Sequence, residues 1–190
     1  MMENKNEKAR LFVAINLPQN ARDVLVAFCE KFSGKKLFSG RCTLPENLHL
    51  TLKFLGEVSP DLVAEIDEAL KNISFQKFDT HFGSFGVLPT REKIRILFVQ
   101  LVCAELPLLA AQVEDALAFQ FERESREFKS HVTVARIKSI QAYNYKKFLQ
   151  EIDEVVLPEI TWKVDSFVLK QSTLTQEGPI YEELKRYELF

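Results

Sequence analysis

The chain has little cysteine and no strong excess of charge. Its three cysteines, Cys29, Cys42 and Cys103, lie far apart and form no Cys-x-x-Cys pair. This spacing argues against a disulfide framework and a thiolate zinc site, and it suits a reducing cytosol. The net charge of -2 lacks the basic excess with which proteins hold long duplexes by their phosphates. Any contact with nucleic acid should therefore be local, at an end or a small site.

Long apolar runs are also missing. The polar start MMENKNEKAR is followed by no signal-peptide core, and no run approaches the ~20 residues that span a membrane. We therefore expect a cytoplasmic protein without a membrane partner, and a monomer. The 190 residues suffice for one domain of two packed lobes, with residues 1–8 as a flexible N-terminus.

Short apolar runs and helical periods alternate along the chain. Pro18, Pro60 and Pro107 open the segments with helical spacing, with Asn20 as the expected N-cap of the first. A further short helix begins near Ser139. The segments read as strands are 11–15, 48–55, several within 77–102, 131–137, 161–171 and 180–189.

A weak internal repeat organises these segments. Arg10-Leu-Phe-Val-Ala-Ile, a helix and the strand with His49-Leu-Thr51 form one unit, and Arg95-Ile-Leu-Phe-Val-Gln, a helix and the strand with His131-Val-Thr133 form its echo. The two histidines are 82 positions apart. The repeat predicts an α+β fold of two pseudo-symmetric lobes of antiparallel sheet with helices outside, and the two motifs in a central cleft.

Strand alternation assigns faces to the motif residues. In the strand 48–55, which carries the first motif, His49, Thr51 and Lys53 share one face of the strand. Leu48, Leu50, Leu52 and Phe54 share the other face. His131 and Thr133 likewise share a face, whereas alternation turns Arg136 away from His131.

This pairing suits phosphodiester hydrolysis. A hydroxyl can donate to a phosphoryl oxygen while the imidazole two residues away moves a proton. Histidine can act as acid or base near neutral pH, so two facing units supply both roles without a metal. One His-x-Thr would be a weak signal, but two copies among three histidines favour catalysis. His81 has no such partner and is interpreted as a strand histidine without a catalytic role.

Other candidates carry competing structural interpretations. Lys53 and Arg136 could neutralise phosphate or form salt bridges on a strand. Tyr181 could stack on a base or belong to the core. Arg91, Lys93 and Arg95 are better interpreted as a solvated hairpin face than as an RNA contact.

The sequence resembles the 2H phosphoesterases, specifically the RNA 2′,3′-cyclic phosphodiesterases also called 2′-5′ RNA ligases. The matching segments, in the right order over nearly the whole chain, are 10–18, 49–56, 128–136, 167–172 and 178–181. The resemblance implies two lobes around a central cleft and opening of a terminal 2′,3′-cyclic phosphate to a 2′-phosphomonoester, without metal or cofactor. It further implies that one histidine protonates the 3′ oxygen and the other activates water; we assign these to His49 and His131, an order that the sequence does not fix.

Under the same resemblance, Thr51 and Thr133 bind the non-bridging oxygens, and the partner is an RNA end or oligonucleotide. Ser130 stands where the family often has Pro, and Phe98 where it often has Trp, which leaves base stacking open. Two alternatives stay open: joining of 2′-5′ ends, and a nucleotide- or RNA-binding module without useful catalysis.

Overall fold

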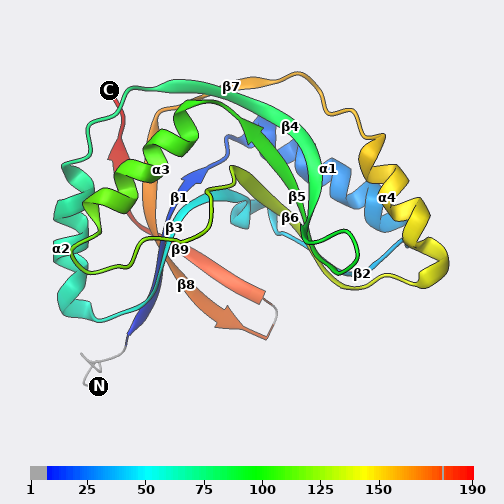
Figure 1. Ribbon diagram of the computed structural model, residues 1–190, viewed down its shortest axis with the longest axis horizontal. Helices are drawn as coiled ribbons and strands as arrows, with labels where there is room; N and C mark the ends of the chain where they lie inside the picture. The colour runs from blue at the N-terminus through cyan, green and yellow to red at the C-terminus, as the bar shows by residue number, and fades with distance from the viewer. Residues whose placement is uncertain (1–7, 177) are drawn as a thin grey trace.

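The computed structural model describes residues 8–176 and 178–190; the predicted N-terminal segment therefore lies almost wholly outside the described residues. These residues form one curled antiparallel sheet, ordered β7-β4-β5-β6-β3-β1-β8-β9 with β2 paired to β6, and four α-helices (Figure 1). The strands are β1 (Ala9–Asn16), β2 (Ser39–Cys42), β3 (His49–Val58), β4 (Phe78–Pro89), β5 (Ile94–Val102), β6 (His131–Ser139), β7 (Thr161–Val164), β8 (Ser166–Thr175) and β9 (Gly178–Glu188). The helices are α1 (Gln19–Gly34), α2 (Pro60–Lys71), α3 (Glu105–Ala116) and α4 (Tyr145–Asp153), with single 3-10 turns at Pro45–Asn47 and Ala142–Asn144.

The sheet has two halves that meet at its middle. Strands β3, β1, β8 and β9 form one half, and β6, β5, β4, β7 and β2 form the other. The halves are joined by the pairing of β3 with β6, which is registered at Leu50 opposite Val132. These are the central residues of the two His-x-Thr motifs. The predicted α+β architecture with a repeat-related centre is therefore confirmed.

The helices cover the face of the sheet opposite the motif histidines. Helices α2 and α3 lie against β9 and β3, whereas α1 and α4 lie against β6 and β4 (Figure 1). Each half is thus covered partly by a helix from the other half of the chain: α1, which follows β1, packs on the second half through Phe28 and Phe85, whose ring centroids lie 4.1 Å apart. Burial of these apolar faces provides the main stabilisation of the fold.

Both motif strands contain a β-bulge, an extra residue that breaks the alternation of side chains. In β3 the partner of Val13 is Lys53 and that of Ala14 is Thr51, so Leu52 is the extra residue. In β6 the partners of Leu97 and Phe98 are Ala135 and Thr133, so Val134 is the extra residue. A bulge turns the side chains that follow it to the opposite face from that given by simple alternation.

Several local predictions are wrong. Strand β6 extends to Ser139, so the short helix expected there begins only at Tyr145, and α3 begins at Glu105 rather than at Pro107. Helix α1 begins at Gln19 after Pro18 and has no side-chain cap, so Asn20 is not its N-cap. Cys29 and Cys42 form a disulfide, with Cα atoms 6.2 Å apart and 13 residues of separation, although their spacing argued against one. The bridge ties α1 to β2, a short strand where the sequence predicts no regular element.

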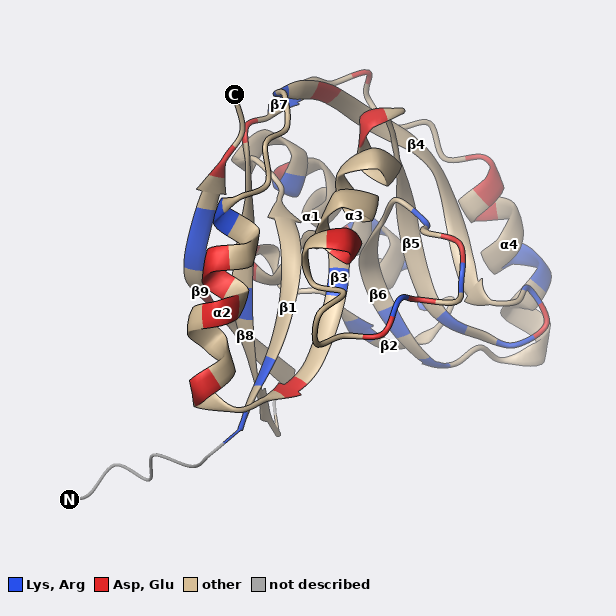
Figure 2. Ribbon diagram, turned by 60° about the vertical axis from the view of Figure 1, so that its left-hand side comes forward, with Lys and Arg blue, Asp and Glu red and all other residues tan. Residues whose placement is uncertain are grey.

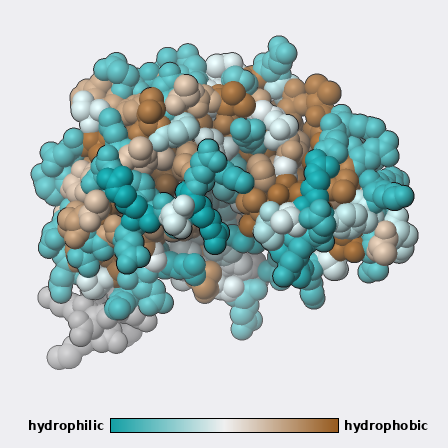
Figure 3. Space-filling view, viewed as in Figure 1, coloured by the Kyte–Doolittle hydropathy of each residue, from teal (hydrophilic) through white to brown (hydrophobic). Residues whose placement is uncertain are grey.

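The surface is mixed in charge and polarity. Figure 2 shows acidic residues on α2 and α3 and basic residues along β9 and near β2 and β6. On the face in Figure 3, hydrophilic side chains gather along the lower rim, with apolar atoms between and above them. Among the described residues, no helix is long and apolar enough to cross a membrane.

Candidate active site

His49 stands at the start of β3 and is oriented by the residue two positions before it. Its Nδ1 lies 2.7 Å from the backbone carbonyl of Asn47. Because a carbonyl can only accept, Nδ1 carries the proton and Nε2 is the nitrogen available to a ligand. Nε2 lies 3.1 Å from Oγ1 of Thr51, which can donate to it. The buried Asn47 side chain in turn donates to the carbonyl of Pro179, 2.7 Å away.

His131 repeats this arrangement at the start of β6. Its Nδ1 lies 2.7 Å from the backbone carbonyl of Lys129, which again leaves Nε2 for a ligand. The same local device thus fixes the same tautomer in both motifs. This equivalence extends the repeat from sequence to side-chain geometry.

The register of β3 and β6 brings the two motifs together. Leu50 and Val132 pair and point into the core, so their neighbours point to the opposite face. In an antiparallel pair, this register sets His49 beside Thr133 and Thr51 beside His131. The two imidazoles and two hydroxyls therefore share one face of the sheet at the junction of its halves, as the sequence predicted; we call it the cleft face.

The pKa of His49 is lowered from 6.5 to about 4. Burial of the imidazole is the main cause; the hydrogen bond to Asn47 opposes it, and the positive charges of Lys170, His131 and Arg136 lower the pKa further. In the free protein His49 is therefore neutral at pH 7.

Lys53 does not belong to this cleft. The bulge at Leu52 turns it to the helix side, where its Nζ donates to Glu114 of α3 at 2.7 Å and to the carbonyl of Glu122 at 3.0 Å. Its side chain is 2% exposed. The prediction that Lys53 faces the substrate is wrong, and the salt-bridge alternative is correct.

The same bulges bring two other side chains onto the cleft face. Phe54, which alternation assigned to the core face, is 65% exposed, and its ring centroid lies 6.1 Å from that of Phe12. Arg136 is exposed and close enough to His49 to lower its pKa. Phe54 and Arg136 occupy equivalent positions of the two motifs, 82 positions apart. Arg136 is therefore available to a phosphate, contrary to its predicted direction.

Aromatic rings pack against one side of each motif histidine. The ring centroids of Phe12 and Tyr181 lie 5.0 Å and 5.1 Å from that of His49, and Tyr181 is perpendicular to it. Tyr181 is half-buried and thus lies at the cleft as part of the wall that positions His49. Phe12 carries no motif signal beyond its place in the first strand.

Phe98 has the corresponding place beside His131, with ring centroids 5.3 Å apart. Its ring lies over Gly86 of β4, where an added Cβ would overlap Cζ of Phe98. Gly86 therefore leaves the space in which this ring packs.

The remaining sequence candidates lie elsewhere. His81 is exposed on β4, separated from β6 by β5. Arg91 pairs with Asp153 through two hydrogen bonds, and Arg95 donates to the carbonyl of Lys138. These contacts agree with a surface role for the basic cluster. Residues 8–176 and 178–190 contain no group of three or more His, Cys, Asp or Glu side chains that could hold a metal ion.

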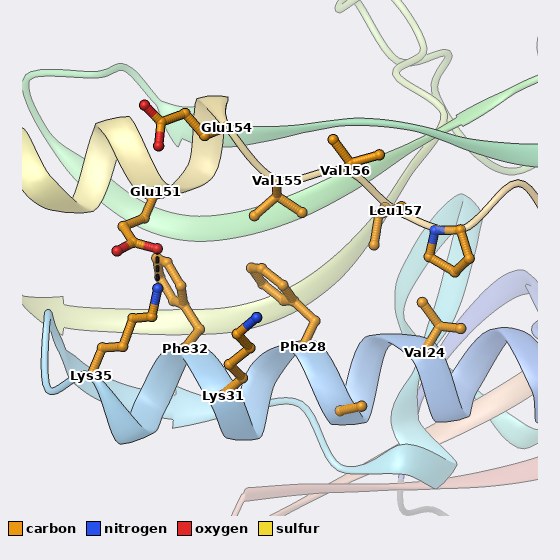
Figure 4. Close-up of a pocket in the computed structure, with 12 residues that line it drawn as sticks. Val24, Phe28, Lys31, Phe32, Lys35, Glu151, Glu154, Val155, Val156 and Leu157 are labelled. Carbon is orange, nitrogen blue, oxygen red and sulfur yellow. Dashed lines mark hydrogen bonds and ion pairs between the residues drawn. The ribbon is translucent and has the colours of Figure 1, made fainter.

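A groove of about 530 Å³ lies on the helix side, between α1 and residues 151–158 (Figure 4). Phe28, Phe32 and Val155 line it, and Lys35 pairs with Glu151 at one end. It contains no residue of either motif and is separate from the cleft.

Comparison with known proteins agrees with this geometry. A family model described as LigT like Phosphoesterase matches twice, over residues 15–98 and 102–181. Each match contains one His-x-Thr motif. The RNA 2′,3′-cyclic phosphodiesterase of Archaeoglobus fulgidus is 33% identical over 189 residues, covering 94% of this chain and 99% of that protein. The protein of the same description from Aeropyrum pernix is 38% identical over 143 residues, covering 73% and 80%.

Solved structures give the same result. TT0787 of Thermus thermophilus superposes with a TM-score of 0.77 at 27% identity, covering 94% of this chain and 97% of that one. Escherichia coli LigT complexed with 3′-AMP gives 0.75 at 25% identity, covering 96% and 99%. The fold and the paired motifs define a 2H phosphoesterase. The chain belongs to the LigT-like phosphoesterase family.

Proposed function

We propose that this phosphoesterase hydrolyses terminal 2′,3′-cyclic phosphates of RNA or oligonucleotides to 2′-phosphomonoesters. The observation that carries the proposal is the matched pair of imidazoles, each with Nδ1 bound to a backbone carbonyl and Nε2 left to a ligand. The descriptions of the archaeal relatives and the 3′-AMP bound to LigT support the choice of substrate. A cytoplasmic location stays a prediction, and the Cys29–Cys42 bond removes one observation behind it.

In the proposed reaction, a water oxygen attacks phosphorus while Nε2 of His131 accepts a proton from that water molecule. The bond from phosphorus to the 3′ oxygen breaks, and that oxygen receives a proton from Nε2 of His49. The hydroxyls of Thr51 and Thr133 donate to the non-bridging oxygens, where charge accumulates in the transition state. Arg136 adds a positive charge on the same face.

Product analysis tests the proposal. RNA ending in a 2′,3′-cyclic phosphate, incubated with the protein in EDTA, should yield a 2′-phosphate end. His49→Ala and His131→Ala should each lower kcat by about 10²–10⁴-fold while the circular dichroism spectrum is retained. Intact substrate, a 3′-phosphate product, or a near-normal rate in either variant would contradict the mechanism.

The acid role of His49 makes a separate prediction, because its pKa of about 4 leaves it neutral in the free protein. An anion bound between the two imidazoles stabilises the charged form and must raise this pKa for His49 to donate at neutral pH. NMR titration of the His49 ring should therefore give a pKa of about 4 in the free protein. With adenosine 2′-monophosphate bound, the pKa should rise toward the ordinary histidine value of about 6.5 or beyond. An unchanged pKa in the complex would assign the acid role to His131 instead.

A further inference from the structure

Lys170 is a buried cation on the cleft face of the first half of the sheet. It lies in β8, where it pairs with Phe12 of β1 and Glu183 of β9, and it is 5% exposed. Its neighbour Leu169 points into the core, so Lys170 points to the opposite face, as Phe12 does. Among the positive charges that lower the pKa of His49, that of Lys170 has the largest effect.

No acidic group neutralises Lys170 directly. The nearby carboxylate of Glu183 already accepts hydrogen bonds from Asn16 at 3.0 Å and from Arg186 at 2.9 and 2.8 Å. Within the described part of the chain, no carboxylate lies within ion-pair distance of the Lys170 ammonium. Burial and the charges of Arg22 and Arg186 lower the pKa of Lys170, while Glu183 opposes them.

Arg22, at the start of α1, is a second cation near Lys170, and it has a hydrogen-bond donor without an acceptor. Its Nε is buried and has no hydrogen-bond partner in the described structure. Leaving this buried Nε without a partner costs free energy, which an anionic ligand would recover. The Lys170–Arg22 region therefore has the properties of an anion site, because Glu183 alone opposes the positive charges of Lys170, Arg22 and Arg186.

The position of this site separates it from the reacting phosphate. The strand order places β8 two strands from β3, on the side away from β6, which corresponds to about 10 Å between backbones. In the proposed reaction, the cyclic phosphate lies between His49 and His131, at the junction of β3 and β6. Lys170 is therefore placed to bind a different anionic group of the same ligand.

The ribose at the end of an RNA chain carries two anionic groups: the cyclic phosphate and the phosphodiester at its 5′ oxygen. We propose that Lys170, assisted by Arg22, binds the 5′-phosphate of the terminal nucleotide. This inference rests on the proposed function. It predicts that this chain, despite its net charge of -2, prefers a nucleotide within RNA over a free nucleoside cyclic phosphate.

Two ligands that differ only in the 5′-phosphate test the site without catalysis. Calorimetry on the intact protein should show that adenosine 2′,5′-bisphosphate binds about tenfold more tightly than adenosine 2′-monophosphate at about 0.1 M salt. Lys170→Gln should reduce this ratio below about threefold. Both ligands carry the 2′-phosphate, so any change that the lost charge causes at His49 affects them equally and cancels in the ratio. Lys170→Arg should keep most of the preference, because it keeps the charge.

Lys185→Gln is the matched control. Lys185 is an exposed lysine of β9 whose charge acts on Asp67 of α2, on the helix side of the sheet. This variant should keep the wild-type ratio. Equal binding of the two ligands by the wild-type protein, an unchanged ratio in Lys170→Gln, or the same loss in Lys185→Gln would overturn the proposal.

A parallel assay separates this proposal from the proposed function. If adenosine 2′,3′-cyclic monophosphate is hydrolysed but the bisphosphate has no advantage, only the 5′-phosphate site is wrong. If the bisphosphate is preferred through Lys170 but no cyclic phosphate is hydrolysed, only the proposed reaction is wrong.

Discussion

Single residues of the cleft owe their roles to backbone contacts as much as to their own chemistry. His49 and His131 each give Nδ1 to the carbonyl two residues earlier, so a short local turn decides which nitrogen faces the ligand. Histidines that lack such a contact can adopt either tautomer. The structural motif in each half therefore begins two positions before the histidine, at the residue whose carbonyl fixes the ring.

Lys53 gives the clearest prediction at this scale. Lys53→Met should lower the free energy of unfolding by about 2–4 kcal/mol, because it leaves Glu114 partly buried and without its partner. It should leave kcat within about twofold, since Lys53 lies on the helix side of β3. Urea unfolding and cyclic-phosphate hydrolysis measure the two effects. A loss of activity larger than the loss of folded protein would contradict this placement and indicate that Lys53 contacts the substrate.

At the scale of elements, the bulges mark the limit of what the sequence could predict. Period-two alternation assigned His49, Thr51, His131 and Thr133 correctly, because these residues precede the bulges. It failed for Lys53, Phe54 and Arg136, which follow them. Neither Leu52 nor Val134 differs in type from an ordinary strand residue, so nothing local announces the extra residue.

Long-range pairing explains the other elements that the sequence did not reveal. Strand β2 has only four residues, Ser39–Cys42, and exists because it pairs with β6. Close packing accompanies this pairing, since a Cβ on Gly40 would overlap the carbonyl oxygen of Arg136. Similarly, the Cys29–Cys42 bond depends on α1 and β2 both meeting β6, which cysteine spacing alone cannot show. In the sequence, Lys170 follows an apolar run and looks like an ordinary strand lysine. Its importance becomes visible only when the structure shows that it shares a face of the sheet with Phe12.

The disulfide makes the prediction at this scale. Closing a loop between residues 13 positions apart should contribute about 3 kcal/mol to the free energy of unfolding. Dithiothreitol should therefore lower the urea midpoint of the wild-type protein and leave that of Cys29→Ala/Cys42→Ala unchanged. Titration of the unreduced, unfolded protein should find one free thiol, Cys103. If all the cysteines titrate without reduction, the bond does not form.

At the scale of the whole molecule, the two halves depend on one another. Helix α1 belongs by sequence to the first repeat and by packing to the second, and α3 belongs to the second repeat and packs on β3 of the first. This exchange buries both helices against strands that come later or earlier in the chain. The face that carries both motifs consequently combines strands of both halves, so we expect the proposed catalytic groups to depend on the stability of the whole fold.

That coupling predicts how stability depends on pH. The pKa of His49 is about 4 in the folded protein and about 6.5 in an unfolded chain, so between these values the unfolded state binds more protons. Protonation of His49 therefore favours unfolding as the pH falls from about 6.5 to about 4, and the penalty is absent at higher pH. A half-buried imidazole should give roughly 1–2 kcal/mol, less than the full shift would correspond to. Urea unfolding at about pH 7 and about pH 4.5 should show that the wild-type protein loses this much more stability than His49→Gln. Other groups titrate equally in both proteins, so parallel loss in the two would mean that His49 is not held neutral by the fold.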